Sequence, residues 1–272
     1  MNKESYFIGK FKDKLIGDDG VLVENFIYSM DAFFENVHFK REWMSIKEIA
    51  KKAMLINISD AIAMNAKPKY ALLSVAIPKE FSLLELDELA EGFLDIANDY
   101  GVRIIGGDTI SNTKLDISIT IISKSSNPLR RNTIKNGNLL AYTGTIGSSK
   151  RDLAKLQRGF SINKKSKFIT PVLRQEFITK SSKHLTGGMD ISDGLFTELE
   201  RLSKLNKIKF DFFSQIKKDM GCSGEEYEMI VAFRPKDKKK ILNIAKKTKT
   251  ALTIFAKAKK GGFKSRCKQH HF

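Results

Sequence analysis

Acidic residues flanked by glycine or serine recur along this chain, and their types suit metal and phosphate chemistry. They occur in residues 17–20 (GDDG), 29–31 (SMD), 57–60 (NISD), 106–109 (GGDT) and 190–194 (DISDG). A carboxylate beside residues without bulk can approach an ion or a phosphate closely. Mg²⁺ takes oxygen ligands, usually a few carboxylates completed by water and substrate phosphates. The pattern predicts a metal-dependent enzyme that acts on phosphates, provided that these segments converge in space.

The segment that contains Asp60 lies on a predicted helix. Asn57, Asp60 and Met64 fall at positions i, i+3 and i+7, so they share one face amid apolar neighbours. Burying a neutral polar group there without a partner would cost about 2–7 kcal/mol. These groups therefore either bond to local backbone or face a polar site, and the sequence leaves both readings open.

The other acidic segments also admit structural interpretations. The glycines before Asp108 follow a predicted buried strand, where they would allow close approach to a ligand or form an ordinary turn. The adjacent carboxylates of residues 17–20 would form a turn or bind a cation that relieves their repulsion. Ser192 or Asp193 would cap the following helix, or the start of that helix would bind a phosphate. A cap does not explain the additional carboxylate of Asp190.

Motifs for covalent catalysis and for the common nucleotide-binding folds are absent. Neither the Walker spacing nor G-x-G-x-x-G occurs, and residues 147–150 (GSSK) resemble a phosphate loop only superficially. No Cys/His pair or Ser/His/Asp set stands out. Cys222 and Cys267 have no spacing typical of a disulfide framework or a zinc site. Nucleotide binding is therefore expected without a P-loop or a Rossmann domain.

The hydrophobic pattern predicts strands and helices in both halves of the chain. We expect strands over residues 25–31, 70–77, 102–105, 116–123, 138–142, 227–233 and 251–256, and helices over residues 45–66, 82–98, 148–158, 171–181, 195–205 and 236–247. Residues 125–131 (SSNPLRR) are polar and contain a proline, which predicts a domain boundary. The fold class is therefore α/β or α+β with two domains, residues 1–126 and 127–272.

Composition favours a globular protein with a basic surface. The 272 residues are 42% hydrophobic and 29% charged, with a net charge of +17. There is no apolar run long enough to span a bilayer, and the first residues lack the apolar core of a signal peptide, so we expect a cytoplasmic location. The lysines are scattered on polar helix faces and no nucleic-acid motif accompanies them. This pattern favours a solvated lysine-rich surface over a nucleic-acid footprint.

Taken in order, the motifs resemble those of thiamine-monophosphate kinases. The series runs from about residue 8 to the end of the chain: Gly-Asp-Asp, Ser-x-Asp with His38 downstream, NISDA with MNAKP, GGDT, DISDGL and GEEYE. The resemblance implies a two-domain fold like that of aminoimidazole ribonucleotide synthetase, each domain a mixed sheet packed with helices. It also implies a homodimer formed through the N-terminal domains. The implied activity transfers the γ-phosphoryl of ATP to thiamine monophosphate with several Mg²⁺ ions.

The resemblance assigns roles by position. The implied Mg²⁺ ligands are Asp19, Ser29, Asp31, Asp60, Asp108, Asp190 and Asp193. The implied ATP contacts are Gly107, Asp108, Arg131 and Ser192, and the implied thiamine contacts are His38, Glu225 and Phe272. Catalysis would depend on Asp31, Asp60, Asp108 and Asp193. These roles suit phosphoryl transfer, which mostly requires positioning and charge neutralisation.

Departures from the family pattern leave rival functions to consider. Met30 stands where the family has threonine, and the stretch between Asp193 and Glu225 is short for the family. An enzyme like aminoimidazole ribonucleotide synthetase is an open alternative. A selenophosphate synthetase is disfavoured because the N-terminal half has no cysteine, and a hydrogenase-maturation dehydratase because the sequence ends in Phe272 rather than cysteine. A basic nucleic-acid-binding protein on a degenerate kinase fold is the alternative of a different class.

Overall fold

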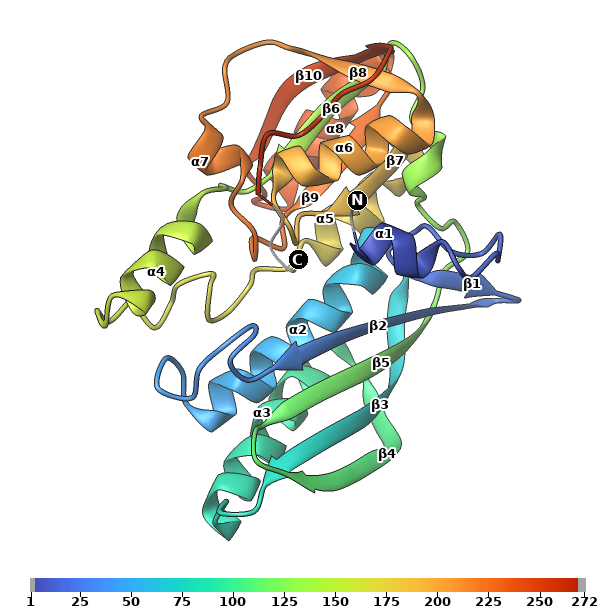
Figure 1. Cartoon of the computed structure of the whole chain (residues 1–272). Helices are drawn as coiled ribbons and strands as arrows, with labels where there is room; N and C mark the ends of the chain where they lie inside the picture. Colours follow the sequence, from blue (N-terminus) through green and yellow to red (C-terminus); the bar gives the residue numbers. More distant parts are fainter. Residues whose placement is uncertain (1–2, 269–272) are drawn as a thin grey trace.

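A computed structural model of the chain describes residues 3–268 and contains two five-stranded sheets. One sheet is built from residues 21–124 and the other from residues 139–260. The sheets occupy opposite ends of the molecule, and helix α2 extends between them (Figure 1). This two-sheet α/β arrangement confirms the predicted fold class.

The first sheet has the strand order β1-β2-β5-β3-β4. Its strands are β1 (Val21–Val23), β2 (Phe26–Phe34), β3 (Lys67–Pro78), β4 (Arg103–Asn112) and β5 (Asp116–Lys124). Only the β3–β4 pair is parallel, because helix α3 (Leu83–Tyr100) returns the chain between those two strands. The other pairs are antiparallel, so this sheet is mixed as predicted.

Helix α2 (Ile46–Ala63) packs against the first sheet and also reaches β7 and α5 of the second half. Serine caps start both long helices: Ser45 with Glu48 for α2, and Ser82 with Glu85 for α3. Because α2 is covered on most sides, polar residues along it must find partners inside the protein.

The second sheet has the order β7-β9-β6-β10-β8. Its strands are β6 (Leu139–Thr143), β7 (Leu185–Asp190), β8 (Ile208–Phe212), β9 (Met229–Phe233) and β10 (Leu252–Lys260). All four pairings are antiparallel, so the prediction of a mixed sheet is wrong for this domain. Parallel neighbours require a crossover connection, and here adjacent strands run in opposite directions instead.

Shorter elements complete the chain. The remaining α-helices are α1 (Lys3–Ile8), α4 (Ser148–Gln157), α5 (Gln175–Ser181), α6 (Leu195–Asn206), α7 (Lys218–Gly221) and α8 (Lys238–Lys247), and the 3₁₀ turns are η1 (Arg131–Thr133), η2 (Ser182–His184) and η3 (Pro235–Asp237). Strands β1, β7 and β8 were not predicted; β7 (LTGGMD) carries two glycines, which are disfavoured in strands. Within residues 3–268, no helix combines the length and apolar character needed to cross a membrane.

Two sequence-based expectations about local structure are wrong. The glycines before Asp108 do not form a turn after a strand, because they lie within β4. Cys222 and Cys267 form a disulfide with Cα atoms 5.5 Å apart, although they lie 45 residues apart in the sequence. Their spacing alone could not reveal this pair, since the segment after β10 reaches the end of α7 only in the folded chain.

Candidate active site

Three carboxylates from distant parts of the sequence meet between the two sheets. Asp19 precedes β1, Asp60 lies near the end of α2, and Asp190 ends β7. One oxygen from each lies within 4.8 Å of the other two. The side chain of Asp19 is 1% exposed and Asp190 is 2% exposed. The predicted convergence is therefore confirmed for these three residues.

Two arginines after the first sheet and a serine of α2 hold this cluster. Arg131 forms an ion pair with Asp19. The Arg131 backbone N–H donates to Asp18 Oδ1 over 2.7 Å, and Arg130 Nη1 lies 3.4 Å from Asp18 Oδ2. Ser59 Oγ donates to Asp190 Oδ2 over 2.7 Å. The Gly-Asp-Asp segment is thus a turn, and it also contributes a carboxylate to the cluster.

Asp31 lies on β2, close enough to the cluster for its pKa to respond to the charges there. Burial raises its pKa to about 6, and the negative charges of Glu225, Asp19 and Asp193 add to this, while Arg131 opposes it. Burial likewise raises the pKa of Asp60 well above its ordinary value, with further increases from Asp31 and from Asp190. Crowded, desolvated carboxylates of this kind are stabilised by a bound cation.

Asn57 resolves the two readings left open for α2. Its Nδ2 donates to the Ala53 carbonyl over 2.9 Å, and its Oδ1 accepts from the Asp31 backbone N–H over 2.7 Å. Ser29 Oγ donates to the Asn57 carbonyl over 3.4 Å. Asn57 therefore bonds to local backbone and also fixes the strand that carries Asp31. Met30 points to the opposite side of that strand and is 62% exposed.

The start of α6 brings a second charged group to the site. Arg201 Nη2 lies 2.6 Å from Asp193 Oδ2, and Arg201 Nη1 lies 2.7 Å from Glu198 Oε2. Glu198 Oε1 accepts from the Asp193 backbone N–H over 3.0 Å and from Ser192 Oγ over 3.5 Å. Neither Ser192 nor Asp193 caps the helix with its side chain. Sequence reasoning missed Glu198 and Arg201, although their i, i+3 spacing next to DISDG was a usable signal.

Asp108 and Gly107 are not brought to this cluster within one chain. One row of paired residues crosses the sheet from β2 to β4. Asp31 pairs with Ile119, Ile119 with Leu73, and Leu73 with Gly107. Three strand spacings separate β2 from β4, about 14 Å. Asp108 is exposed on this edge strand, and its carboxylate accepts from the Thr109 backbone N–H. A Cβ at Gly107 would lie 1.7 Å from the Leu73 carbonyl oxygen, so strand pairing itself requires this glycine.

Of the predicted thiamine contacts, the structure describes Glu225 and His38. Glu225 pairs with Lys52 Nζ at 2.7 Å, and Lys52 was not recognised from the sequence. The signal for it was a charged residue inside an apolar helical segment. His38 is half-buried beside Phe33, and its Nδ1 accepts from the Phe34 backbone N–H over 3.0 Å. Phe272 falls outside the described residues.

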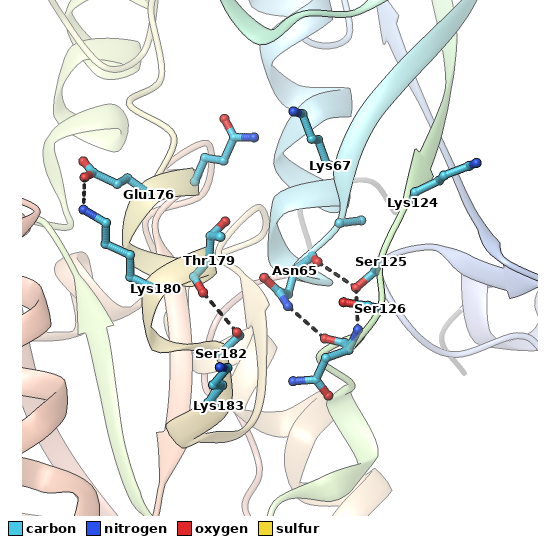
Figure 2. Close-up of a pocket in the computed structure, with 13 residues that line it drawn as sticks. Asn65, Lys67, Lys124, Ser125, Ser126, Glu176, Thr179, Lys180, Ser182 and Lys183 are labelled. Carbon is cyan, nitrogen blue, oxygen red and sulfur yellow. Dashed lines mark hydrogen bonds and ion pairs between the residues drawn. The ribbon is translucent and has the colours of Figure 1, made fainter.

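A separate hollow of about 570 Å³ lies where the two halves adjoin. Figure 2 shows Asn65 bonded to Ser125, with Thr179 of α5 on the opposite side. Ser125 Oγ donates to the Asn65 carbonyl over 2.8 Å, and Asn65 Nδ2 donates to the Asn127 carbonyl over 2.9 Å. Among the described residues, none of the predicted site residues lines this hollow, so it is distinct from the carboxylate cluster.

Known proteins resemble this chain over most of its length. A thiamine-monophosphate kinase of Buchnera aphidicola subsp. Schizaphis graminum is 32% identical over 281 residues, which cover 91% of this chain and 86% of the relative. The chain belongs to the thiamine-monophosphate kinase family. A thiamine-monophosphate kinase of Nitrosopumilus maritimus is 30% identical over 85% of this chain and 80% of its own length.

A domain model and two solved structures also match the chain. Residues 17–124 match the family model described as AIR synthase related protein, N-terminal domain. A solved structure described as AaThiL complexed with AMPPCP and TMP has a TM-score of 0.88 and 21% identity, covering 99% of this chain and 96% of its own. Thiamine monophosphate kinase from Aquifex aeolicus has a TM-score of 0.82 and 20% identity, covering 95% and 92%. These structures show that the thiamine-monophosphate kinase fold extends over the whole chain.

Proposed function

We propose that this member of the family transfers the γ-phosphoryl group of ATP to thiamine monophosphate, giving thiamine diphosphate and ADP. The observation that carries the proposal is the meeting of Asp19, Asp60 and Asp190 beside Arg131. Such a site attracts metal-bound phosphates, because carboxylates bind hard cations and a guanidinium pairs with phosphate oxygens. The two sheets belong to residues 1–126 and 127–272, which we propose as the two domains that enclose the cleft.

The donor set fits Mg²⁺, because it offers crowded carboxylate oxygens that repel one another and that a cation would stabilise. The raised pKa values of Asp31 and Asp60 reflect this crowding and their burial. We propose Asp19, Asp60 and Asp190 as ligands, with Ser29, Asp31 and Asp193 supplying further oxygens nearby. When bound, Mg²⁺ neutralises charge that develops on the transferred phosphoryl group. Several ions are expected, since more carboxylates gather here than one ion requires.

The chain's own residues would position the two anions rather than attack them. We propose that Arg131 and Ser192 contact ATP, since both border the carboxylates on the second-half side of the cleft. Asn57 would keep Asp31 in place on β2, where its carboxylate would serve as an oxygen ligand for Mg²⁺. In-line transfer between two bound phosphates requires positioning and charge neutralisation more than a protein nucleophile.

We propose Glu225 and His38 as thiamine contacts at the other end of the cleft. Glu225 keeps 24% of its side chain exposed beside Asp31, so a ligand in the cleft can reach its carboxylate. The amino group of the thiamine pyrimidine is a suitable donor to it. The role of Phe272 is carried over from the family pattern alone.

We also propose that the protein acts as a homodimer and that Gly107 and Asp108 serve the partner's site. The β4 edge carries exposed Ile105 and Ile110, at 50% and 57%, and Leu72 and Met30 add apolar area on the open face of the same sheet. Edge strands and apolar faces of this kind are usually covered. A second copy across this face would bring β4 towards the neighbouring cleft.

The decisive assay mixes the purified protein with ATP, Mg²⁺ and thiamine monophosphate. We expect thiamine diphosphate and ADP in equal amounts. No product at any Mg²⁺ concentration would exclude the proposal, and turnover of aminoimidazole ribonucleotide precursors instead would favour that rival. Salt-dependent binding of DNA or RNA without ATP turnover would favour the nucleic-acid alternative.

Two features bear on the location of the protein. ATP as co-substrate supports a cytoplasmic location, whereas the Cys222–Cys267 disulfide argues for a less reducing compartment.

A further inference from the structure

Lys52 is a charged side chain in the buried middle of α2. The residue is 0% exposed, and its ammonium lies 3.9 Å from the centroid of the Phe168 ring and 5.4 Å from that of Phe33. Aromatic faces attract a cation but do not replace its hydration. A buried ammonium is therefore costly unless a carboxylate lies next to it.

That carboxylate belongs to Glu225, which comes from the second half of the chain. Lys52 Nζ lies 2.7 Å from Glu225 Oε2, and the Tyr227 hydroxyl donates to Glu225 Oε1 over 3.1 Å. The Glu225 backbone N–H donates to the Ser192 carbonyl over 2.7 Å, and its φ is +59°. Both oxygens and the backbone of Glu225 are therefore held by neighbours.

The pair occupies a defined place relative to the carboxylate cluster. Lys52 and Asp60 are eight residues apart along α2. At the rise of an α-helix this separates them by about 12 Å. The Glu225 side chain keeps 24% of its surface exposed, and its negative charge adds to the raised pKa of Asp31, so Glu225 lies near Asp31.

We propose that Lys52 is a positioning residue for thiamine monophosphate. It would hold the carboxylate of Glu225 in place at the substrate end of the cleft, so that Glu225 accepts a hydrogen bond from the thiamine ring. This inference rests on the proposed function and deepens it. Lys52 itself is covered by Phe33, Phe168 and Glu225, so it acts through Glu225 without touching the substrate.

The first test compares Lys52→Met with Lys51→Met. Lys51 is the adjacent lysine, but it pairs with Asp95 at 2.7 Å on the other side of α2. In Lys52→Met we expect the KM for thiamine monophosphate to rise about tenfold or more, as when a hydrogen bond to a charged group is lost. The KM for ATP and kcat should stay near the wild-type values, and Lys51→Met should change none of the three. Thermal melting of each variant reports whether the fold is kept.

The second test is a double-mutant cycle with Glu225→Gln. If Lys52 acts through Glu225, the double variant should have the same KM for thiamine monophosphate as Glu225→Gln alone. The double variant leaves no unpaired buried charge, so this comparison holds even if Lys52→Met alone fails to fold.

Three results would overturn the inference. These are an unchanged KM for thiamine monophosphate in a folded Lys52→Met protein, a loss confined to kcat, or additive effects in the cycle. Failure of the proposed function is a different result, because the wild-type protein would then neither bind nor phosphorylate thiamine monophosphate. Calorimetric binding of thiamine monophosphate to the wild-type protein without ATP separates the two cases.

Discussion

A carboxylate at this site is expected to lower the stability of the metal-free protein and to raise its activity. Asp60 lies beside Asp19 and Asp190 in a desolvated setting, where like charges repel. The same crowding suits a bound cation, so what destabilises the metal-free protein favours metal binding. Each carboxylate can therefore be tested by removing its charge, which should lower kcat and raise the melting temperature of the metal-free protein.

Asp60→Asn should lower kcat and raise the melting temperature of the metal-free protein. The lost ligand should reduce kcat about a hundredfold or more, the scale seen when a charge-stabilising group is removed from an active site. The melting temperature should rise because one buried negative charge is gone. Asp211→Asn, an exposed carboxylate paired with Lys259, is the control and should do neither. An active Asp60→Asn protein would remove Asp60 from the metal site.

Stabilisation by Mg²⁺ should grow with pH. The pKa of Asp31 is about 6 in the folded chain against 3.8 for an ordinary aspartate, so the folded state binds more protons in this window. Without metal, the free energy of unfolding therefore falls as pH rises from 3.8 through about 6. Mg²⁺ competes with these protons, so its shift of melting temperature should be small at about pH 5 and larger at about pH 8. A shift independent of pH would contradict this, and K⁺ at equal ionic strength is the control.

At the scale of elements, α2 and β4 show why local patterns were only partly informative. The α2 pattern predicted a helix with a polar face, and the structure has that helix with Asn57, Ser59 and Lys52 all paired inside the protein. The glycine pair before Asp108 predicts either a close approach to a ligand or a turn, whereas both glycines lie within β4 and Gly107 faces the backbone of β3. Glycines that face a strand and glycines that face a ligand look the same in a sequence.

Gly107→Ala should destabilise the first sheet far more than Gly106→Ala. Both residues have positive φ, but a Cβ at Gly107 would lie 1.7 Å from the Leu73 carbonyl oxygen, against 3.7 Å to a Leu72 methyl at Gly106. We expect Gly107→Ala to lower the free energy of unfolding by about 3 kcal/mol or more, since the backbone must move. Urea unfolding of both variants measures the difference. Equal losses would mean that strain in φ, and not the close strand, sets the requirement.

At the scale of the whole molecule, the open face of the first sheet decides whether one chain is a complete enzyme. Asp108 lies about three strand spacings from Asp31 in the same chain, about 14 Å. The exposed Ile105 and Ile110 on its strand favour a symmetric partner. A dimer through this face makes a specific prediction about mixed subunits.

Asp60→Asn and Asp108→Asn subunits should complement each other if Asp108 serves the partner's site. Each homodimer should be nearly inactive, but every mixed dimer has one site with both aspartates intact. A random equal mixture should recover about a quarter of wild-type activity, because half of its dimers are mixed and each has one active site. Asp60→Asn mixed with Asp190→Asn is the control and should not recover, since both residues belong to one chain's cluster. No recovery in the first mixture would place Asp108 in its own chain's site or outside the machinery.

The sequence by itself determined the types and order of the groups that do chemistry. Hydrophobic periodicity and capping residues predicted most helices and strands, because these depend on neighbours close in the chain. The glycine- and serine-flanked aspartates predicted a metal and phosphate site for the same local reason. Local secondary structure and motif composition do not depend on how the elements are arranged in space.

Only the tertiary structure decided which of these groups meet. It joined Asp19, Asp60 and Asp190, left Asp108 on a distant edge, and paired Lys52 with Glu225 and Cys222 with Cys267. Such contacts depend on strand order and on how the two halves pack, which are set by long-range burial of apolar surface. That burial is a property of the whole chain, so no short segment could reveal its result.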